Sequence, residues 1–82
     1  MLDPTISAQV REFLGRTIRA QYEDGDDIFA LGFVNSLFAM QLVQFLKQGF
    51  GIEVESEDLE LDNFRSVAAI TRFVQRKRAA AA

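Results

Sequence analysis

The chain lacks residue types that carry much of the familiar chemistry of protein sites. Cysteine, histidine and tryptophan are all absent from its 82 residues. Without cysteine there is no disulfide and no thiolate nucleophile, and without histidine the usual general base and the usual zinc ligands are missing too. The sequence therefore predicts no catalytic residue, no metal site and no enzymatic activity of its own.

Long apolar runs are missing as well. No stretch approaches the roughly 20 apolar residues that span a bilayer, and Met1–Pro4 has no basic start of a secretory leader. With 49% hydrophobic and 26% charged residues, the composition fits one small globular domain. We expect a cytoplasmic monomer without membrane partners, made of a single domain over residues 1–78 and a frayed alanine tail over residues 79–82.

The acidic residues are concentrated in two segments. Residues 23–27 and 53–62 are rich in Asp and Glu and contain no Lys or Arg, and the net charge of the chain is -3. Such segments repel a nucleic-acid backbone. We therefore expect no nucleic-acid partner.

Apolar spacing predicts the first half of the bundle. Asp3 and Pro4 form a good helix start, and apolar residues then recur at three- and four-residue intervals to about Ala20. Residues 21–34 form a long loop, acidic at first and then apolar around Gly32. Loops of this length in a compact domain are more often functional than not.

The second half begins with a central helix over Ser36–Phe50, which Gly51 closes in the left-handed conformation. Ser56 is expected to cap a brief helical turn, and Ser66 a final helix. The buried positions of that final helix are predicted to be Val67, Ile70, Phe73 and Val74. The fold class is thus all-α, a bundle of three main helices and one short helix with a long loop between the first two main helices.

Ser36 stands where the long loop gives way to the central helix. Its hydroxyl is expected to be exposed at a helix N-terminus, among unpaired backbone N–H groups. Such a place suits a phosphate. Taken alone, a serine at this position is an ordinary helix cap.

The residues around Ser36 resemble the attachment site of acyl and peptidyl carrier proteins. The resemblance rests on Asp27-Ile28-Phe29, Leu31-Gly32 and Asn35-Ser36-Leu37, followed by the apolar helix and the Ile52-Glu53-Val54 link. It covers nearly the whole chain. The resemblance implies an acyl-carrier-like fold and a stand-alone carrier, in which 4'-phosphopantetheine from coenzyme A is esterified to Ser36, between Asn35 and Leu37, and carries an acyl thioester between enzymes.

Three departures narrow the type of carrier. Asn35 replaces the usual aspartate, no acid occurs over Ser36–Phe50, and three residues separate Gly32 from the serine, as in D-alanyl and peptidyl carriers. These features differ from fatty-acid carriers. The runs over residues 32–43 and 61–67 resemble most those of the discrete hydroxymalonyl- and methoxymalonyl-type carriers of polyketide and antibiotic biosynthesis, which load a glycerate-derived three-carbon unit.

This resemblance implies several partner enzymes: a phosphopantetheinyl transferase, an acyl-loading ligase or transferase, tailoring dehydrogenases, and an acyltransferase or polyketide synthase. The docking face is predicted to comprise Val34, Phe38, Met40 and Gln41. Contacts there should be apolar and only weakly dependent on salt. For Phe38 there is an alternative, packing under the preceding loop against Phe29 or Phe33.

Two other functions stay open. In one, the arm carries an aminoacyl, D-alanyl or peptidyl group that an adenylating enzyme loads. In the other, the chain is a helical adaptor without a prosthetic group, and the apolar face of its central helix binds a partner directly.

Overall fold

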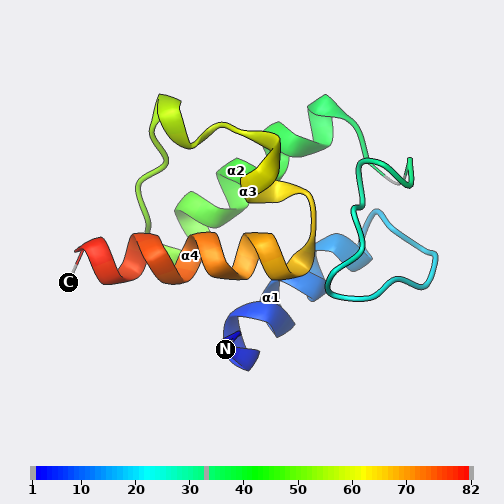
Figure 1. Cartoon of the computed structure of the whole chain (residues 1–82), viewed down its shortest axis with the longest axis horizontal. Coiled ribbons are helices and arrows are strands. Elements are labelled where there is room, and N and C mark those ends of the chain that lie inside the picture. The colour runs from blue at the N-terminus through cyan, green and yellow to red at the C-terminus, as the bar shows by residue number, and fades with distance from the viewer. Residues whose placement is uncertain (1, 33, 82) are drawn as a thin grey trace.

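The computed structural model describes residues 2–32 and 34–81, and the regular structure in these ranges is helical. The elements are α1 (Pro4–Gly15), α2 (Ser36–Phe50), the 3₁₀ turn η1 (Ser56–Asp58), α3 (Leu61–Phe64) and α4 (Val67–Ala81). Figure 1 shows α4 lying along the long axis, with α1 on one side of it and α3 on the other, and the long loop beyond its N-terminal end. The predicted all-α bundle of three main helices is confirmed.

Helix α1 begins as predicted and ends early. The Asp3 carboxylate accepts hydrogen bonds from two N–H groups of the first turn, at 2.9 and 3.4 Å, and Pro4 is the first helical residue. The helix ends at Gly15 and not near Ala20, because glycine favours the unfolded backbone over a helix by about 1 kcal/mol relative to alanine. Ile18 is nevertheless buried in the core.

The long loop is held against the start of α4. Arg11 Nε donates to Asp24 Oδ1 at 2.8 Å, and the Asp24 carbonyl accepts from the Ala68 N–H at 2.9 Å. Farther along, the N–H of the fully buried Ile28 donates to the Arg65 carbonyl at 2.7 Å. The loop that leads to Ser36 is therefore held by main-chain and side-chain hydrogen bonds.

Helix α2 matches its predicted bounds. It ends on Gly51, whose φ of 65° is left-handed, as expected. Four apolar side chains at four-residue spacing form its buried face: Phe38, Leu42, Leu46 and Phe50. This packing anchors α2 along its whole length.

The predicted single short helix is divided into η1 and α3. Ser56 does not cap it. Instead, the Asp58 carboxylate accepts from the Glu55 N–H at 3.0 Å and closes the 3₁₀ turn from its other end. The side chain of Asp58 is longer than a serine hydroxyl and reaches back across the turn.

Helix α4 begins on the predicted cap, since Ser66 Oγ accepts from the Ala69 N–H at 3.0 Å. All four predicted inward positions are buried: Val67, Ile70, Phe73 and Val74. Both α1 and α3 pack on this helix. It continues through Ala81, so fraying of residues 79–82 stays a prediction, and Ala82 lies outside the described residues.

Candidate functional site

Ser36 is the first residue of α2 and is exposed. Within residues 2–32 and 34–81 its hydroxyl has no hydrogen-bond partner, and neither do the backbone N–H groups of Ser36 and Leu37. A free hydroxyl next to free N–H donors at the positive end of a helix fits a phosphate ester.

The capping role belongs to Asn35. Its side-chain oxygen accepts from the Phe38 N–H at 3.0 Å, and its carbonyl accepts from the Ala39 N–H at 3.0 Å. Asn35 therefore caps the helix, and the Ser36 hydroxyl is not used for capping. Leu37 is 70% exposed and points away from the core.

The approach to Ser36 is shaped by a compact turn. Asp27 Oδ1 accepts from the N–H groups of Phe29 and Ala30, at 3.0 and 2.9 Å, and the Asp27 carbonyl accepts from the Leu31 N–H at 3.0 Å. Gly32 follows with a φ of 80°, a left-handed backbone conformation that residues other than glycine rarely adopt. Gly32 therefore lets the loop turn sharply before the helix.

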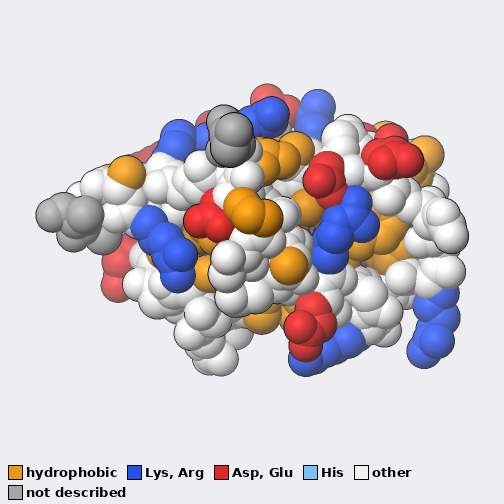
Figure 2. Space-filling view, turned by 90° about the horizontal axis from the view of Figure 1, so that it is seen from below, with side chains coloured by type: hydrophobic (Ala, Val, Ile, Leu, Met, Phe, Trp, Pro, Cys, Tyr) orange, Lys and Arg blue, Asp and Glu red, His pale blue; other side chains and the backbone are white. Residues whose placement is uncertain are grey.

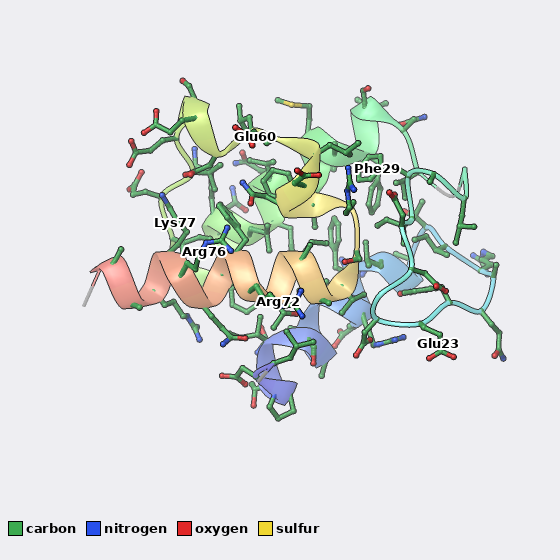
Figure 3. The ribbon with its side chains drawn as sticks, in the orientation of Figure 1. Glu23, Phe29, Glu60, Arg72, Arg76 and Lys77 are labelled. Carbon is green, nitrogen blue, oxygen red and sulfur yellow. The ribbon has the colours of Figure 1, made fainter. Side chains whose placement is uncertain are left out.

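An apolar groove of about 420 Å³ opens beside Ser36. One wall is α2, and the opposite wall is residues 59–64, which include α3. The lining residues are Phe29, Ser36, Ala39, Met40, Val43, Leu59, Glu60, Leu61 and Phe64. Figure 3 labels two of these residues, Phe29 of the long loop and Glu60 just before α3. The serine thus lies at a groove large enough for an apolar chain.

Only part of this groove can be predicted from the sequence. Its α2 wall has a signal in the sequence, since Ser36, Ala39, Met40 and Val43 follow the i, i+3, i+4, i+7 spacing of one helix face. The opposite wall comes from residues 59–64, and no spacing in the sequence relates those residues to α2.

The predicted docking face is only partly at the surface. Met40 is 63% exposed, Gln41 is exposed and Val34 is half-buried. Phe38 is 6% exposed, and its ring lies 5.6 Å from that of Phe13. A docking role for the Phe38 side chain is therefore wrong, because the ring faces the core.

The alternative position of Phe38 is only partly what was expected. Phe38 packs inward, but its ring partner is Phe13 of α1, which also stacks on Phe45 at 4.4 Å. The expected contact with Phe33 lies outside the described residues.

Polar bonds join the second groove wall to α4. Lys77 Nζ lies 2.7 Å from Asp58 Oδ2, and the two side chains are 20% and 19% exposed. This hydrogen bond holds the pKa of Asp58 below its ordinary value and raises the pKa of Lys77. The pair is thus more fully charged over the neutral range than two isolated groups.

Acidic and basic groups are interspersed on the surface. Figure 2 shows Lys, Arg, Asp and Glu side chains intermixed on the face seen from below.

Among the described residues no helix is long and apolar enough to cross a membrane, and no group of His, Cys, Asp and Glu could hold a metal ion. The groove beside Ser36 is therefore the best-defined candidate site.

A comparison with protein families identifies the family of this chain. Residues 4–74 match the family described as "Phosphopantetheine attachment site". The chain belongs to this family of carrier domains. Its cofactor is 4'-phosphopantetheine, which the family binds covalently on a serine. A comparison with curated proteins gives no match.

Family membership separates a carrier from an adaptor without a prosthetic group. The protein is a carrier with a phosphopantetheine arm, so an adaptor without a prosthetic group is wrong. Carrier domains are generally non-catalytic, and they generally work with a phosphopantetheinyl transferase and with synthase or transferase enzymes.

Proposed function

We propose that Ser36 is the attachment residue and that this carrier delivers a glycerate-derived acyl unit in polyketide biosynthesis. The observation that carries the attachment proposal is the exposed, unengaged Ser36 hydroxyl at the start of α2 and at the edge of an apolar groove. The polyketide assignment rests on the resemblance of the sequence to discrete carriers of extender units.

The residues of the chain have separate tasks in this proposal. Ser36 provides the ester oxygen, and the N–H groups of Ser36 and Leu37 stabilise the phosphate with the helix dipole, by roughly 0.3–1 kcal/mol at an exposed site. Asn35 fixes the end of the helix. When bound, the cofactor supplies a terminal thiol that forms the thioester.

The groove favours some cargo over others. Its lining is apolar except for the Ser36 hydroxyl and the Glu60 side chain. A carboxylate close to Glu60 would be repelled, since like charges at short range are unfavourable. A carboxylated extender unit should therefore stay outside the groove, whereas the three-carbon glyceryl unit carries no charge.

Glu60 also favours a second candidate cargo. An aminoacyl thioester carries an ammonium group, which the exposed carboxylate of Glu60 attracts. The three-residue spacing between Gly32 and Ser36, typical of D-alanyl and peptidyl carriers, supports the same candidate. Loading assays with separate glyceryl and amino-acid ligases distinguish the two cargoes.

Partner enzymes are proposed to dock on the exposed side of α2 near the serine. Leu37 and Met40 are the most exposed large apolar residues of this face, and Gln41 and the half-buried Val34 adjoin them. Such a surface fits partners with apolar contacts and few charges.

The test of attachment is a mass measurement after incubation with coenzyme A and a phosphopantetheinyl transferase. We expect the unchanged protein to gain one phosphopantetheinyl group and Ser36→Ala to gain none. The matched control is Ser56→Ala, which removes another exposed hydroxyl at the start of a helical turn and should leave modification intact.

Folding of the variants is checked by circular dichroism and thermal unfolding. Ser36→Ala should change stability by less than about 0.5 kcal/mol, as expected of an exposed position without partners. Modification of Ser36→Ala would refute attachment at Ser36.

A further inference from the structure

The wall of the groove opposite α2 has little hydrophobic support of its own. None of the three residues of η1 is buried, and the side chains of Leu59 and Leu61 are 53% and 49% exposed. Phe64 is the apolar anchor of this wall, with its ring 5.2 Å from that of Phe73 in α4. Phe64 lies at one end of the segment, so something else must position the rest.

Two polar tethers from α4 hold the segment on either side of the exposed leucines. Lys77 Nζ binds Asp58 at 2.7 Å and lies 3.9 Å from Glu55 Oε1. One residue earlier on α4, Arg76 Nη2 donates to Asn63 Oδ1 at 2.9 Å. Figure 3 shows Lys77 and Arg76 on the side of α4 that faces η1 and α3.

The two tethers are also joined to each other. Asn63 Nδ2 donates to the Asp58 carbonyl at 2.8 Å, so Asn63 links the Arg76 side chain to the backbone that the lysine holds. Residues 59–61 lie between these two points. Among the described residues these bonds tie their backbone to α4 and not to α2, across the groove.

Hydrophobic attraction acts in the opposite direction. Met40 on α2 is 63% exposed, and the two leucines line the facing wall. Closing the groove would bury these side chains against one another, which is favourable by about 25 cal/mol per Å² of apolar surface. The polar bonds to α4 oppose this closure.

We propose that Lys77 and Arg76 are positioning residues that keep the groove open by holding Asp58 and Asn63 on α4, so that an uncharged acyl chain attached through Ser36 can lie in it. The acyl part of this inference rests on the proposed function. Neither positioning residue lines the groove, so both act through the wall.

The first test uses the unmodified protein and measures groove closure directly. Lys77→Met removes the ammonium group and keeps an apolar stem, and Asp58→Asn removes the charge with almost no change in shape. We expect nuclear Overhauser contacts between the Met40 methyl and the methyls of Leu59 and Leu61 to strengthen in both variants. Lys77→Arg should restore the original spectrum.

The matched control is Lys47→Met, because Lys47 is an exposed lysine on α2 outside the tethers. It should leave the methyl contacts unchanged. Unaltered contacts in both Lys77→Met and Asp58→Asn would overturn the tether. The result applies whether or not Ser36 accepts the arm, so it is independent of the proposed function.

The second test uses protein loaded with an octanoyl or an acetyl group from the corresponding acyl coenzyme A. Under the proposal the octanoyl chain lies in the groove, whereas an acetyl group has too little apolar surface for its exposure to depend on the groove's width. We expect Lys77→Met to accelerate hydrolysis of the octanoyl thioester by about two- to fivefold, the range for loss of a partly exposed ion pair. Acetyl hydrolysis should stay the same.

The outcomes separate the two proposals. An equal octanoyl rate in Lys77→Met and in the unchanged protein would overturn the positioning role, even if the methyl contacts change. Equal acceleration of both thioesters would also overturn it, because a general loosening of the fold does not discriminate by chain length. Failure to load Ser36 at all would refute the proposed function, and with it the acyl part of this inference.

Discussion

The two walls of the groove are built by different forces. Helix α2 buries an apolar side chain on every turn and is capped at both ends, by Asn35 and Gly51. The segment from Glu55 to Phe64 buries one large apolar side chain and is otherwise held by polar bonds to α4. The proposed attachment serine is on the wall that packing makes firm.

This difference teaches how a small chain can combine a fixed point and an adaptable surface. A well-packed helix keeps its register, because each shift would create cavities. Partly exposed polar bonds are individually weak and can rearrange at low cost. The arm would thus be attached at the rigid wall, and its cargo would face the wall that can adapt.

The largest expected contrast comes from shortening a leucine in each wall. Leu42 of α2 is fully buried, and Leu61 of α3 is half exposed. Leu42→Ala should lower the free energy of unfolding by about 2–5 kcal/mol, and Leu61→Ala by less than about 1 kcal/mol. Urea unfolding followed by circular dichroism measures both, and similar losses would contradict the difference between the walls.

A smaller effect is expected at the cap of α2. Asn35→Ala removes the acceptor of the Phe38 N–H and should cost about 1 kcal/mol in thermal unfolding. Asn35→Asp keeps this bond and adds a negative charge at the positive helix end, which should stabilise the fold by roughly 0.3–1 kcal/mol. Equal stability of the two variants would mean that the cap contributes nothing.

The polar wall should respond to pH in a defined direction. Because Lys77 lowers the pKa of Asp58 in the folded protein, the aspartate stabilises the fold above its ordinary value of 3.8. That contribution disappears as the pH falls through the lowered value. The stability difference between the unchanged protein and Asp58→Asn should therefore be present at neutral pH and vanish in strong acid.

The contribution of Lys77 to stability changes with pH in the opposite direction. The pKa of Lys77 is raised, so its contribution is complete below the ordinary value of 10.5 and disappears as the pH rises through the raised value. Urea unfolding of both proteins across this range checks both pH dependences. A difference independent of pH would show that the pair does not stabilise the wall.

The smallest effect concerns salt. The α2 face beside Ser36 contains no acid, and its charged residue, Lys47, is in the last turn. Binding of a phosphopantetheinyl transferase should therefore change by less than about twofold between low and high ionic strength, since screening acts on charges. Titration calorimetry measures the affinity. A steep salt dependence would mean that the transferase docks on a charged surface and not on this face of α2.

Much of the fold was predictable from the sequence because its signals are local. Caps at Asp3 and Ser66, a glycine at the end of α2 and apolar spacing along α4 each act within one or two turns. The prediction was wrong at the end of α1, where Gly15 stops the helix. It was also wrong for the cap of η1, where the carboxylate of Asp58, two residues beyond Ser56, accepts the capping bond.

The candidate site was predictable on one side only. Ser36, Asn35 and the turn around Gly32 are neighbours in the chain, so their arrangement follows from helix ends and backbone conformation. The orientation of Phe38 was not predictable in this way. A phenylalanine on a helix can face either side, and the position of Phe13 on α1 drew this ring into the core.

By itself, the sequence determined that this is a small helical carrier with one serine at the start of its central helix. Those properties depend on residue types and on spacing within single elements. Only the tertiary structure decided that a groove opens beside the serine, and that Lys77 and Arg76 hold its far wall. That wall and α4 are distant in sequence, and their contact exists only once the core has brought them together.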